Sequence, residues 1–243
     1  MHINTRVESC TAEKTGEVTL TFDAGAPLTV GAVLVAVGRK SNTEQLGLAA
    51  AGVAVGERGL IDVDERYCTC VPHTYAAGDV IGFPALASTS MQQARRAVQH
   101  ALNLGAPADT MHLLPTGIYT IPEVGMVGET EESLRNGGVD YIVGRAPYEA
   151  SARGRIIGDT TGFIKLLFRR ADKRLLGVHV MGEQATEIVH IGLVAMLAGA
   201  TAELFDNACF NIPTLGELYK YATLDALLHN AGAVVESEPI EGL

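Results

Sequence analysis

Apolar and polar positions alternate through much of the first forty residues, as expected for strands with one buried face. Two such runs, residues 6–10 and 18–22, flank Lys14-Thr15-Gly16, so this stretch predicts a β-hairpin. Residues 30–37 form a nearly unbroken apolar run, which is typical of a strand buried on both faces, and the run stops at Gly38-Arg39. The same rules predict three further elements: short strands at residues 59–63 and 75–77, and an amphipathic helix at residues 88–104.

The composition changes at Gly105-Ala106-Pro107-Ala108-Asp109, where we expect a domain boundary. Beyond it, period-two runs alternate with helical spacing, which predicts an antiparallel sheet with helices on one side, an α+β fold. The chain then divides into residues 1–110, residues 111–230 and a flexible acidic tail, 231–243. The elements expected in the second part are strands at 141–143, 163–168 and 175–180, and helices at 129–136, 184–197, near Ala202, and at 215–229.

Charge and hydropathy exclude several classes of partner. The chain carries a net charge of −10 and has no block of Lys or Arg, so nucleic acid and anionic membrane are not expected to bind. The longest apolar run, residues 191–200, is about half the ~20 residues of a membrane helix. No apolar signal segment follows Met1, so we expect a cytoplasmic protein.

Cysteine and histidine spacing does not predict a metal or disulfide site. The four cysteines are scattered, and the pair Cys68 and Cys70 has no second pair to complete a zinc site. Glu187 and His190 have the helical spacing of half a di-metal site, but no second such pair occurs. We therefore expect no metal.

Two glycine-containing segments carry candidate binding chemistry. The apolar run ends at Gly38-Arg39, and a glycine there lets the backbone approach a ligand closely, although many α/β strands end this way. In Gly78-Asp79, a carboxylate directly follows a glycine turn and can accept hydrogen bonds from the hydroxyls of a polyol. A turn aspartate that caps a helix fits the second segment equally well.

Two further segments lie in the second part of the chain. Residues 115–128 are punctuated by proline and glycine and indicate a rigid, close-packed crossing. In residues 210–217, Thr214 and Glu217 have the spacing of a capping box at the start of a helix.

In their order and spacing, these four segments resemble the carboxyl-terminal half of the flavoprotein disulfide-reductase superfamily, over nearly the whole chain. The resemblance implies that residues 1–110 are the remainder of an FAD/NAD(P)-binding α/β domain and that residues 111–230 form an α+β dimerisation domain of a homodimer. It also implies that Gly78 and Asp79 bind the ribityl chain and phosphates of FAD, and that Ala87 meets the flavin through its backbone. Gly38 and Arg39 would border the nicotinamide nucleotide.

The segment at residues 212–217 distinguishes branches of this superfamily. Thiol–disulfide members carry His-Pro-Thr-x-x-Glu, in which the histidine is the acid/base partner of a reactive thiol. Here Ile212 occupies the histidine position, while Glu217 is retained. Isoleucine cannot carry a proton, so we predict no catalytic residue in this segment. Residues 115–123 and 182–192 look closest to the transhydrogenase branch, which transfers hydride from NADPH to NAD⁺ through flavin.

The family's phosphate-binding and redox motifs do not occur in the sequence. It contains neither G-x-G-x-x-G nor C-x-x-x-x-C. We therefore expect a fragment that is inactive alone and binds FAD weakly or not at all. Two alternatives remain: a non-catalytic dimerisation module, and a fragment of a dihydrolipoamide-dehydrogenase-like oxidoreductase.

Overall fold

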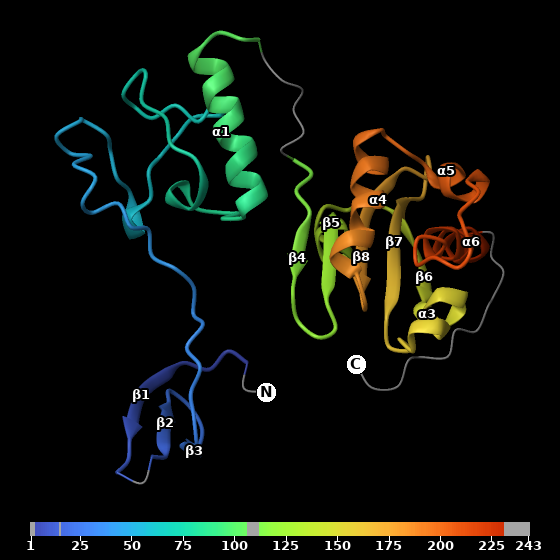
Figure 1. Cartoon of the computed structure of the whole chain (residues 1–243), viewed down its shortest axis with the longest axis horizontal. Coiled ribbons are helices and arrows are strands. Elements are labelled where there is room, and N and C mark those ends of the chain that lie inside the picture. Colours follow the sequence, from blue (N-terminus) through green and yellow to red (C-terminus); the bar gives the residue numbers. More distant parts are fainter. Residues whose placement is uncertain (1–2, 15, 106–111, 231–243) are drawn as a thin grey trace. The chain divides into compact units, whose positions relative to one another are not determined.

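The computed structural model describes residues 3–14, 16–105 and 112–230. The chain forms two compact units, Met1–Ala106 and Pro107–Leu243 (Figure 1). The predicted tail, residues 231–243, lies outside the described residues, as do positions 106–109 of the expected boundary and Thr15 of the expected hairpin turn.

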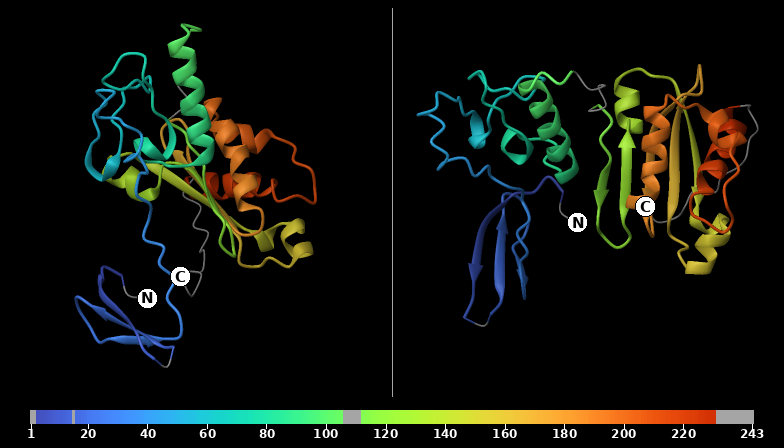
Figure 2. Two further views of the ribbon diagram at one scale, coloured as in Figure 1. Left: turned by 60° about the vertical axis from the view of Figure 1, so that its left-hand side comes forward. Right: turned by 45° about the horizontal axis from the view of Figure 1, so that its top comes forward.

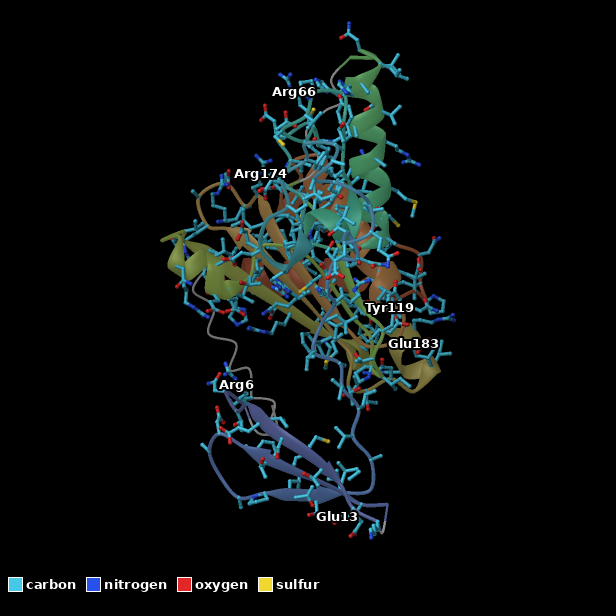
Figure 3. All side chains as sticks on the ribbon, turned by 90° about the vertical axis from the view of Figure 1, so that its left-hand side faces the viewer. Arg6, Glu13, Arg66, Tyr119, Arg174 and Glu183 are labelled. Atoms are coloured by element: carbon cyan, nitrogen blue, oxygen red, sulfur yellow. The ribbon has the colours of Figure 1, made fainter. Side chains whose placement is uncertain are left out.

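The first unit begins with a three-stranded antiparallel sheet in the order β1-β2-β3. Its strands are β1 (Val7–Ala12), β2 (Val18–Phe22) and β3 (Leu28–Val30), so both strands of the predicted hairpin are confirmed. Arg6 and Glu13 mark the two ends of β1 in Figure 3. The backbone N–H of Arg6 donates to Asp23 Oδ1 at 3.0 Å and closes the end of the sheet.

The predicted strand at residues 30–37 is wrong. Strand β3 ends at Val30, and residues 32–40 adopt no regular secondary structure. The side chains of Leu34 and Val37 are 91% and 92% exposed. A strand buried on both faces needs neighbours along both edges and layers above and below. The described part of the chain places none of these against residues 32–40, so its apolar sequence has nothing to pack on.

The remainder of the first unit is mostly loops around a small core of Val53, Ile61 and Ala76. The predicted strands at 59–63 and 75–77 are wrong, because only the isolated bridges Val55↔Ile61 and Cys68↔Tyr75 form there. Each apolar stretch is short and lies between two turns, so its single bridge does not extend into a strand. The helical elements are the 3₁₀ turns η1 (Glu57–Gly59) and η2 (Gly78–Ile81) and the helix α1 (Ala87–Ala101), which confirms the predicted helix.

The second unit is a five-stranded antiparallel sheet in the order β4-β5-β8-β7-β6. Helices α4 and α6 lie on the same face of the sheet (Figures 1 and 2). The α+β prediction is confirmed. The strands are β4 (Thr116–Ile118), β5 (Val124–Gly128), β6 (Tyr141–Pro147), β7 (Phe163–Arg169) and β8 (Leu175–Met181); the helices are α2 (Glu131–Asn136), η3 (Tyr148–Ala150), α3 (Ala152–Ile157), α4 (Ala185–Leu197), α5 (Ala202–Asn207) and α6 (Leu218–Asn230).

The helices approach the sheet closely because glycines stand at the contacts. A Cβ at Gly144 of β6 would lie 1.8 Å from the carbonyl oxygen of Ala222, which is on α6. The buried Tyr219 hydroxyl then joins α6 to α4, accepting from the N–H of Gly192 at 2.9 Å and donating to the carbonyl of Ile188 at 3.0 Å. Burial raises the pKa of Tyr219, so the hydroxyl keeps its proton and both bonds persist.

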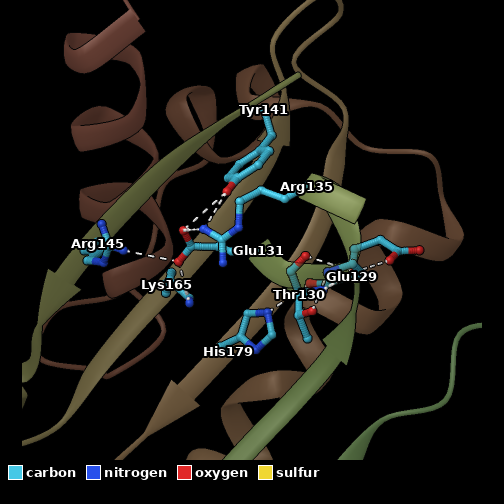
Figure 4. Close-up of polar contacts among 9 residues, drawn as sticks. Glu129, Thr130, Glu131, Arg135, Tyr141, Arg145, Lys165 and His179 are labelled. Carbon is cyan, nitrogen blue, oxygen red and sulfur yellow. Dashed lines mark hydrogen bonds and ion pairs between the residues drawn. The ribbon is translucent and has the colours of Figure 1, made fainter. Parts of the chain in front are cut away.

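On the opposite face of the sheet, α2 is held by a network of ion pairs around Glu131 (Figure 4). Its Oε1 accepts from Lys165 Nζ at 2.8 Å and from Arg145 Nη2 at 3.3 Å. Burial acts to raise the pKa of Glu131, but the hydrogen bond and charge of Lys165, together with Arg145, outweigh it and lower the pKa. Beside this network, the Nε2–H of His179 donates to the Glu129 carbonyl at 3.0 Å.

We expect Gly144→Ala to destabilise the second unit by more than about 2 kcal/mol, because the new methyl group would displace α6 from the sheet. The matched control is Gly216→Ala, where the nearest atom to an added Cβ is the end of the Ile191 side chain at 3.4 Å. The control should lower the free energy of unfolding by less than about 1 kcal/mol. Urea unfolding measures both, and equal losses in the two variants would contradict the packing described here.

We also expect the second unit to lose stability as the pH falls through 6.5. Burial lowers the pKa of His179 from 6.5, aided by the charge of Lys165 and opposed by the Glu129 carbonyl and Glu131. The unfolded chain therefore takes up this proton more readily than the folded one, and stability present above pH 6.5 is lost below it. His179→Gln should flatten this part of the stability curve in urea titrations between pH 7 and pH 5. Parallel curves for the two proteins would refute the assignment.

Candidate functional site

Three loop segments of the first unit surround a cavity of about 420 Å³. They comprise residues 39–42, 58–60 and 79–85. The hydroxyl of Thr43 donates to the Gly59 carbonyl at 2.7 Å and ties the first segment to the second. The N–H of Ile61 donates to the Val80 carbonyl at 2.8 Å and ties the second to the third. The walls of the cavity are therefore fixed to one another by hydrogen bonds.

The Gly78-Asp79 element lies at the start of η2, where a side chain at position 78 has no room. Gly78 has a φ of +83°, and an added Cβ would come within 2.5 Å of Ser90 Oγ on α1. Its buried N–H donates to Gln93 Oε1, also on α1, at 2.7 Å. Helix α1 thus positions the backbone of Gly78, and this backbone directs the Asp79 side chain to the cavity.

Arg39 and Asp79, 40 positions apart in the sequence, form an ion pair at this cavity. Arg39 Nη1 lies 2.7 Å from Asp79 Oδ2, and Arg39 Nη2 donates to the Ala85 carbonyl at 3.1 Å. The resemblance assigned Arg39 to the nicotinamide nucleotide, whereas the structure brings its guanidinium to the carboxylate assigned to FAD. Gly38 has a φ of +108°, and a Cβ added there would meet no atom within 4 Å.

The free carboxylate oxygen of Asp79 is an acceptor that fits the hydroxyls of the ribityl chain of a flavin. In the part of the chain that the structure describes, Arg39 is the one side chain bonded to Asp79, through Oδ2. Oδ1 is left to accept hydrogen bonds from hydroxyl groups. Ala87, the first residue of α1, is exposed, and its helix N-terminus has no side-chain cap. The backbone at Ala87 is therefore accessible to a ligand.

The segment at residues 212–217 differs from its prediction. Thr214 does not cap α6, because its hydroxyl donates to the Asn211 carbonyl at 2.8 Å and the helix begins only at Leu218. The capping box is therefore wrong. Glu217 is instead buried, 3% exposed, with Oε2 accepting from the Tyr221 hydroxyl at 3.2 Å and Oε1 without a partner among the described residues. Ile212 is 68% exposed.

A second cavity, of about 580 Å³, lies in the second unit and was missed by the sequence analysis. Three carboxylates line it, Glu123, Asp159 and Glu183, and groups at the start of α4 donate to the first two. Asp159 Oδ2 accepts from the Glu183 N–H at 2.8 Å, and Glu123 Oε2 accepts from the Thr186 hydroxyl at 2.8 Å. Both bonds hold the start of α4. No sequence pattern indicated this role, because Glu123 and Asp159 lie far from α4 along the chain.

Within the described ranges, no group of three His, Cys, Asp or Glu side chains is placed to hold a metal ion. The cysteines there are unpaired thiols. No described helix is long and apolar enough to cross a membrane.

Two family models match the chain. Residues 1–101 match "Pyridine nucleotide-disulphide oxidoreductase", and residues 114–223 match "Pyridine nucleotide-disulphide oxidoreductase, dimerisation domain". The resemblance seen in the sequence is confirmed by these two matches.

Curated relatives named soluble pyridine nucleotide transhydrogenase are similar over most of this chain. The Mycobacterium tuberculosis protein is 48% identical over 213 residues, covering 87% of this chain and 45% of the relative. The Enterobacter sp. protein is 42% identical over 225 residues, covering 91% and 47%. The chain therefore spans about half the length of these relatives.

Solved structures agree on the fold. LpdA from Mycobacterium tuberculosis superposes with a TM-score of 0.83 at 27% identity, over 91% of this chain and 48% of that protein. The HOCl-induced flavoprotein disulfide reductase RclA from Escherichia coli gives a TM-score of 0.84 at 29% identity, over 91% and 51%. With both of its parts matched by models of one family, the chain belongs to the pyridine nucleotide-disulphide oxidoreductases.

Proposed function

We propose that this chain is the carboxyl-terminal portion of a soluble, FAD-dependent NAD(P) transhydrogenase that moves hydride from NADPH to NAD⁺. The observation that carries the proposal is Ile212. An exposed isoleucine stands where the thiol–disulfide branch needs a proton carrier. Hydride transfer between nucleotides needs no such base. The names of the relatives at 42–48% identity favour the same interpretation.

In this proposal, the residues around the first cavity bind and orient the cofactor. Flavin, when bound, supplies the chemistry by accepting hydride from one nicotinamide and passing it to the other. Asp79 would hold ribityl hydroxyls through Oδ1 while Arg39 fixes the carboxylate from the other side. Gly78, which has no side chain, would let the backbone approach the ribityl chain closely, and the backbone of Ala87 would meet the flavin ring. Gly38 remains a candidate border of the nicotinamide nucleotide.

The chain by itself is proposed to bind FAD weakly and to be inactive, because no G-x-G-x-x-G loop is present to hold the dinucleotide phosphates. A non-catalytic dimerisation module then describes the chain as given, while the transhydrogenase describes the whole protein. A dihydrolipoamide-dehydrogenase-like activity is disfavoured, since Ile212 cannot take up or release a proton. The proposal places the protein in the cytoplasm.

The proposed homodimer would form through α4 of the dimerisation domain. This helix buries one side against the sheet, yet its outward side chains Ile191, Val194 and Leu197 are 38%, 65% and 45% exposed. A helix that is apolar on both sides is usually covered on both sides. The exposed side of α4 is therefore the surface on which a second copy is expected.

Mixing this chain with the amino-terminal half of its Mycobacterium tuberculosis relative should restore transhydrogenase activity. Each half alone should be inactive, and the mixture with FAD should reduce a thionicotinamide analogue of NAD⁺ at the expense of NADPH. The readout is the absorbance of the reduced analogue. A mixture that reduces lipoamide with NADH instead, or a mixture that binds FAD yet transfers no hydride, would refute the proposed function.

Val194→Asp should convert a dimer of the chain to a monomer, because a carboxylate on the outward side of α4 would be desolvated in the interface. Light scattering of the purified chain measures the mass directly. Leu204→Asp on α5, at a side chain that is 50% exposed, is the matched control and should leave the dimer intact. A wild-type monomer, or dissociation in both variants, would contradict the assignment of the interface to α4.

A further inference from the structure

The cavity of the first unit carries positive charge in a protein whose net charge is −10. Three cations, Arg39, Lys40 and Arg58, line it together with one carboxylate, Asp79. Arg39 is neutralised by Asp79, and Lys40 is paired with Glu44. Within the residues described, Arg58 makes no ion pair or side-chain hydrogen bond. Its charge is therefore available to a ligand in the cavity.

Arg58 is held in a backbone conformation that arginine seldom adopts. Its φ and ψ are 62° and 17°, in the left-handed region, and it is followed by Gly59 at φ +77°. Asparagine or glycine is the usual residue at such a turn position, since a larger side chain is strained there. The turn is anchored by the Thr43–Gly59 hydrogen bond, which keeps Arg58 beside the segment that contains Lys40. Strain that is retained at a cavity wall points to a binding role for the side chain.

A buried hydroxyl provides a second, independent observation. Ser41 lines the same cavity, and its Oγ is buried without any hydrogen-bond partner among the described residues. Buried hydroxyls are normally satisfied, so an unpaired one at a cavity wall indicates a missing acceptor. Lysine, arginine and serine together form the donor set that phosphate oxygens accept from.

From these observations we propose that Lys40, Ser41 and Arg58 form a subsite for the phosphate groups of a nucleotide. The exposed ring of Phe83, 96% accessible at the same cavity, offers a surface on which an aromatic base can stack. Two sources share this chemistry: the diphosphate of FAD and a separate adenine nucleotide such as ADP. The phosphate subsite itself does not depend on the proposed function; only the assignment of FAD as its ligand does.

The test is calorimetric titration of the whole chain at low salt with four probes: ADP, inorganic pyrophosphate, FAD and riboflavin. We expect ADP and pyrophosphate to bind and riboflavin, which has no phosphate, to bind at least about tenfold more weakly. Binding should weaken as salt is raised. FAD binding comparable to that of ADP identifies the flavin dinucleotide as an occupant. Binding of ADP without FAD supports the subsite with a separate nucleotide as occupant, and it agrees with the weak FAD binding proposed for the chain alone.

Variants separate this subsite from general attraction of anions. Arg58→Gly relieves the backbone strain, so it should keep or raise the melting temperature. The same variant should weaken ADP binding about five- to tenfold. Ser41→Ala should weaken ADP binding less than Arg58→Gly does, and Arg58→Lys should keep part of the affinity that Arg58→Gly loses. Lys14→Gln, at an exposed lysine outside the cavity, is the matched control and should change nothing. Failure of every phosphate probe to bind, riboflavin binding as tightly as FAD, or equal losses in Arg58→Gly and Lys14→Gln would overturn the inference.

Discussion

Close approach at glycines, where a Cβ would have no room, is the constraint on which both units depend. In the second unit, Gly144 lets the carbonyl of Ala222 on α6 lie almost on β6, and Gly125 does the same for Ala185 at the start of α4. In the first unit, Gly78 leaves room for the side chain of Ser90 on α1. These contacts set how far helices stand from their neighbours. The hydrogen bonds of Tyr219 and Gln93 become possible only at that separation.

The binding chemistry follows from that packing rather than from any single motif. Because α1 fixes the backbone of Gly78, it also fixes where the Asp79 side chain begins, and the Asp79 carboxylate pairs with Arg39. A carboxylate held on one oxygen by a guanidinium keeps its geometry and leaves its other oxygen to a ligand. The cavity walls are therefore assembled by short hydrogen bonds among segments that are distant in sequence. This arrangement suits a cofactor that must be oriented and needs no side chain to react with it.

The sequence predicted elements wherever local pattern and tertiary packing agree. Helices α1 and α4 and the hairpin β1–β2 satisfy both, since their partners lie within the chain. Residues 30–37 have the local pattern of a central strand, but the described residues offer them no neighbouring strand. The glycine before Asp79 singles it out in the sequence, whereas its pairing with Arg39 could not be predicted, because no spacing rule connects residues 40 positions apart. Ser41 and Arg58 had no motif at all; only the cavity and the backbone angle single them out.

Glu217 belongs to the packed framework of its segment, whereas Ile212 does not. A buried carboxylate with an unpaired oxygen is costly, and proteins retain one only when the surroundings are built around it. Here the Tyr221 hydroxyl from α6 holds one oxygen, so the side chain is part of the junction between the loop and the helix. Ile212, by contrast, is exposed and holds nothing in place within the described unit. Exchanging a proton carrier at position 212 therefore disturbs no packing, while exchanging Glu217 would. Under the proposed function, which needs no proton carrier at position 212, Glu217 would still be required by the packing around it.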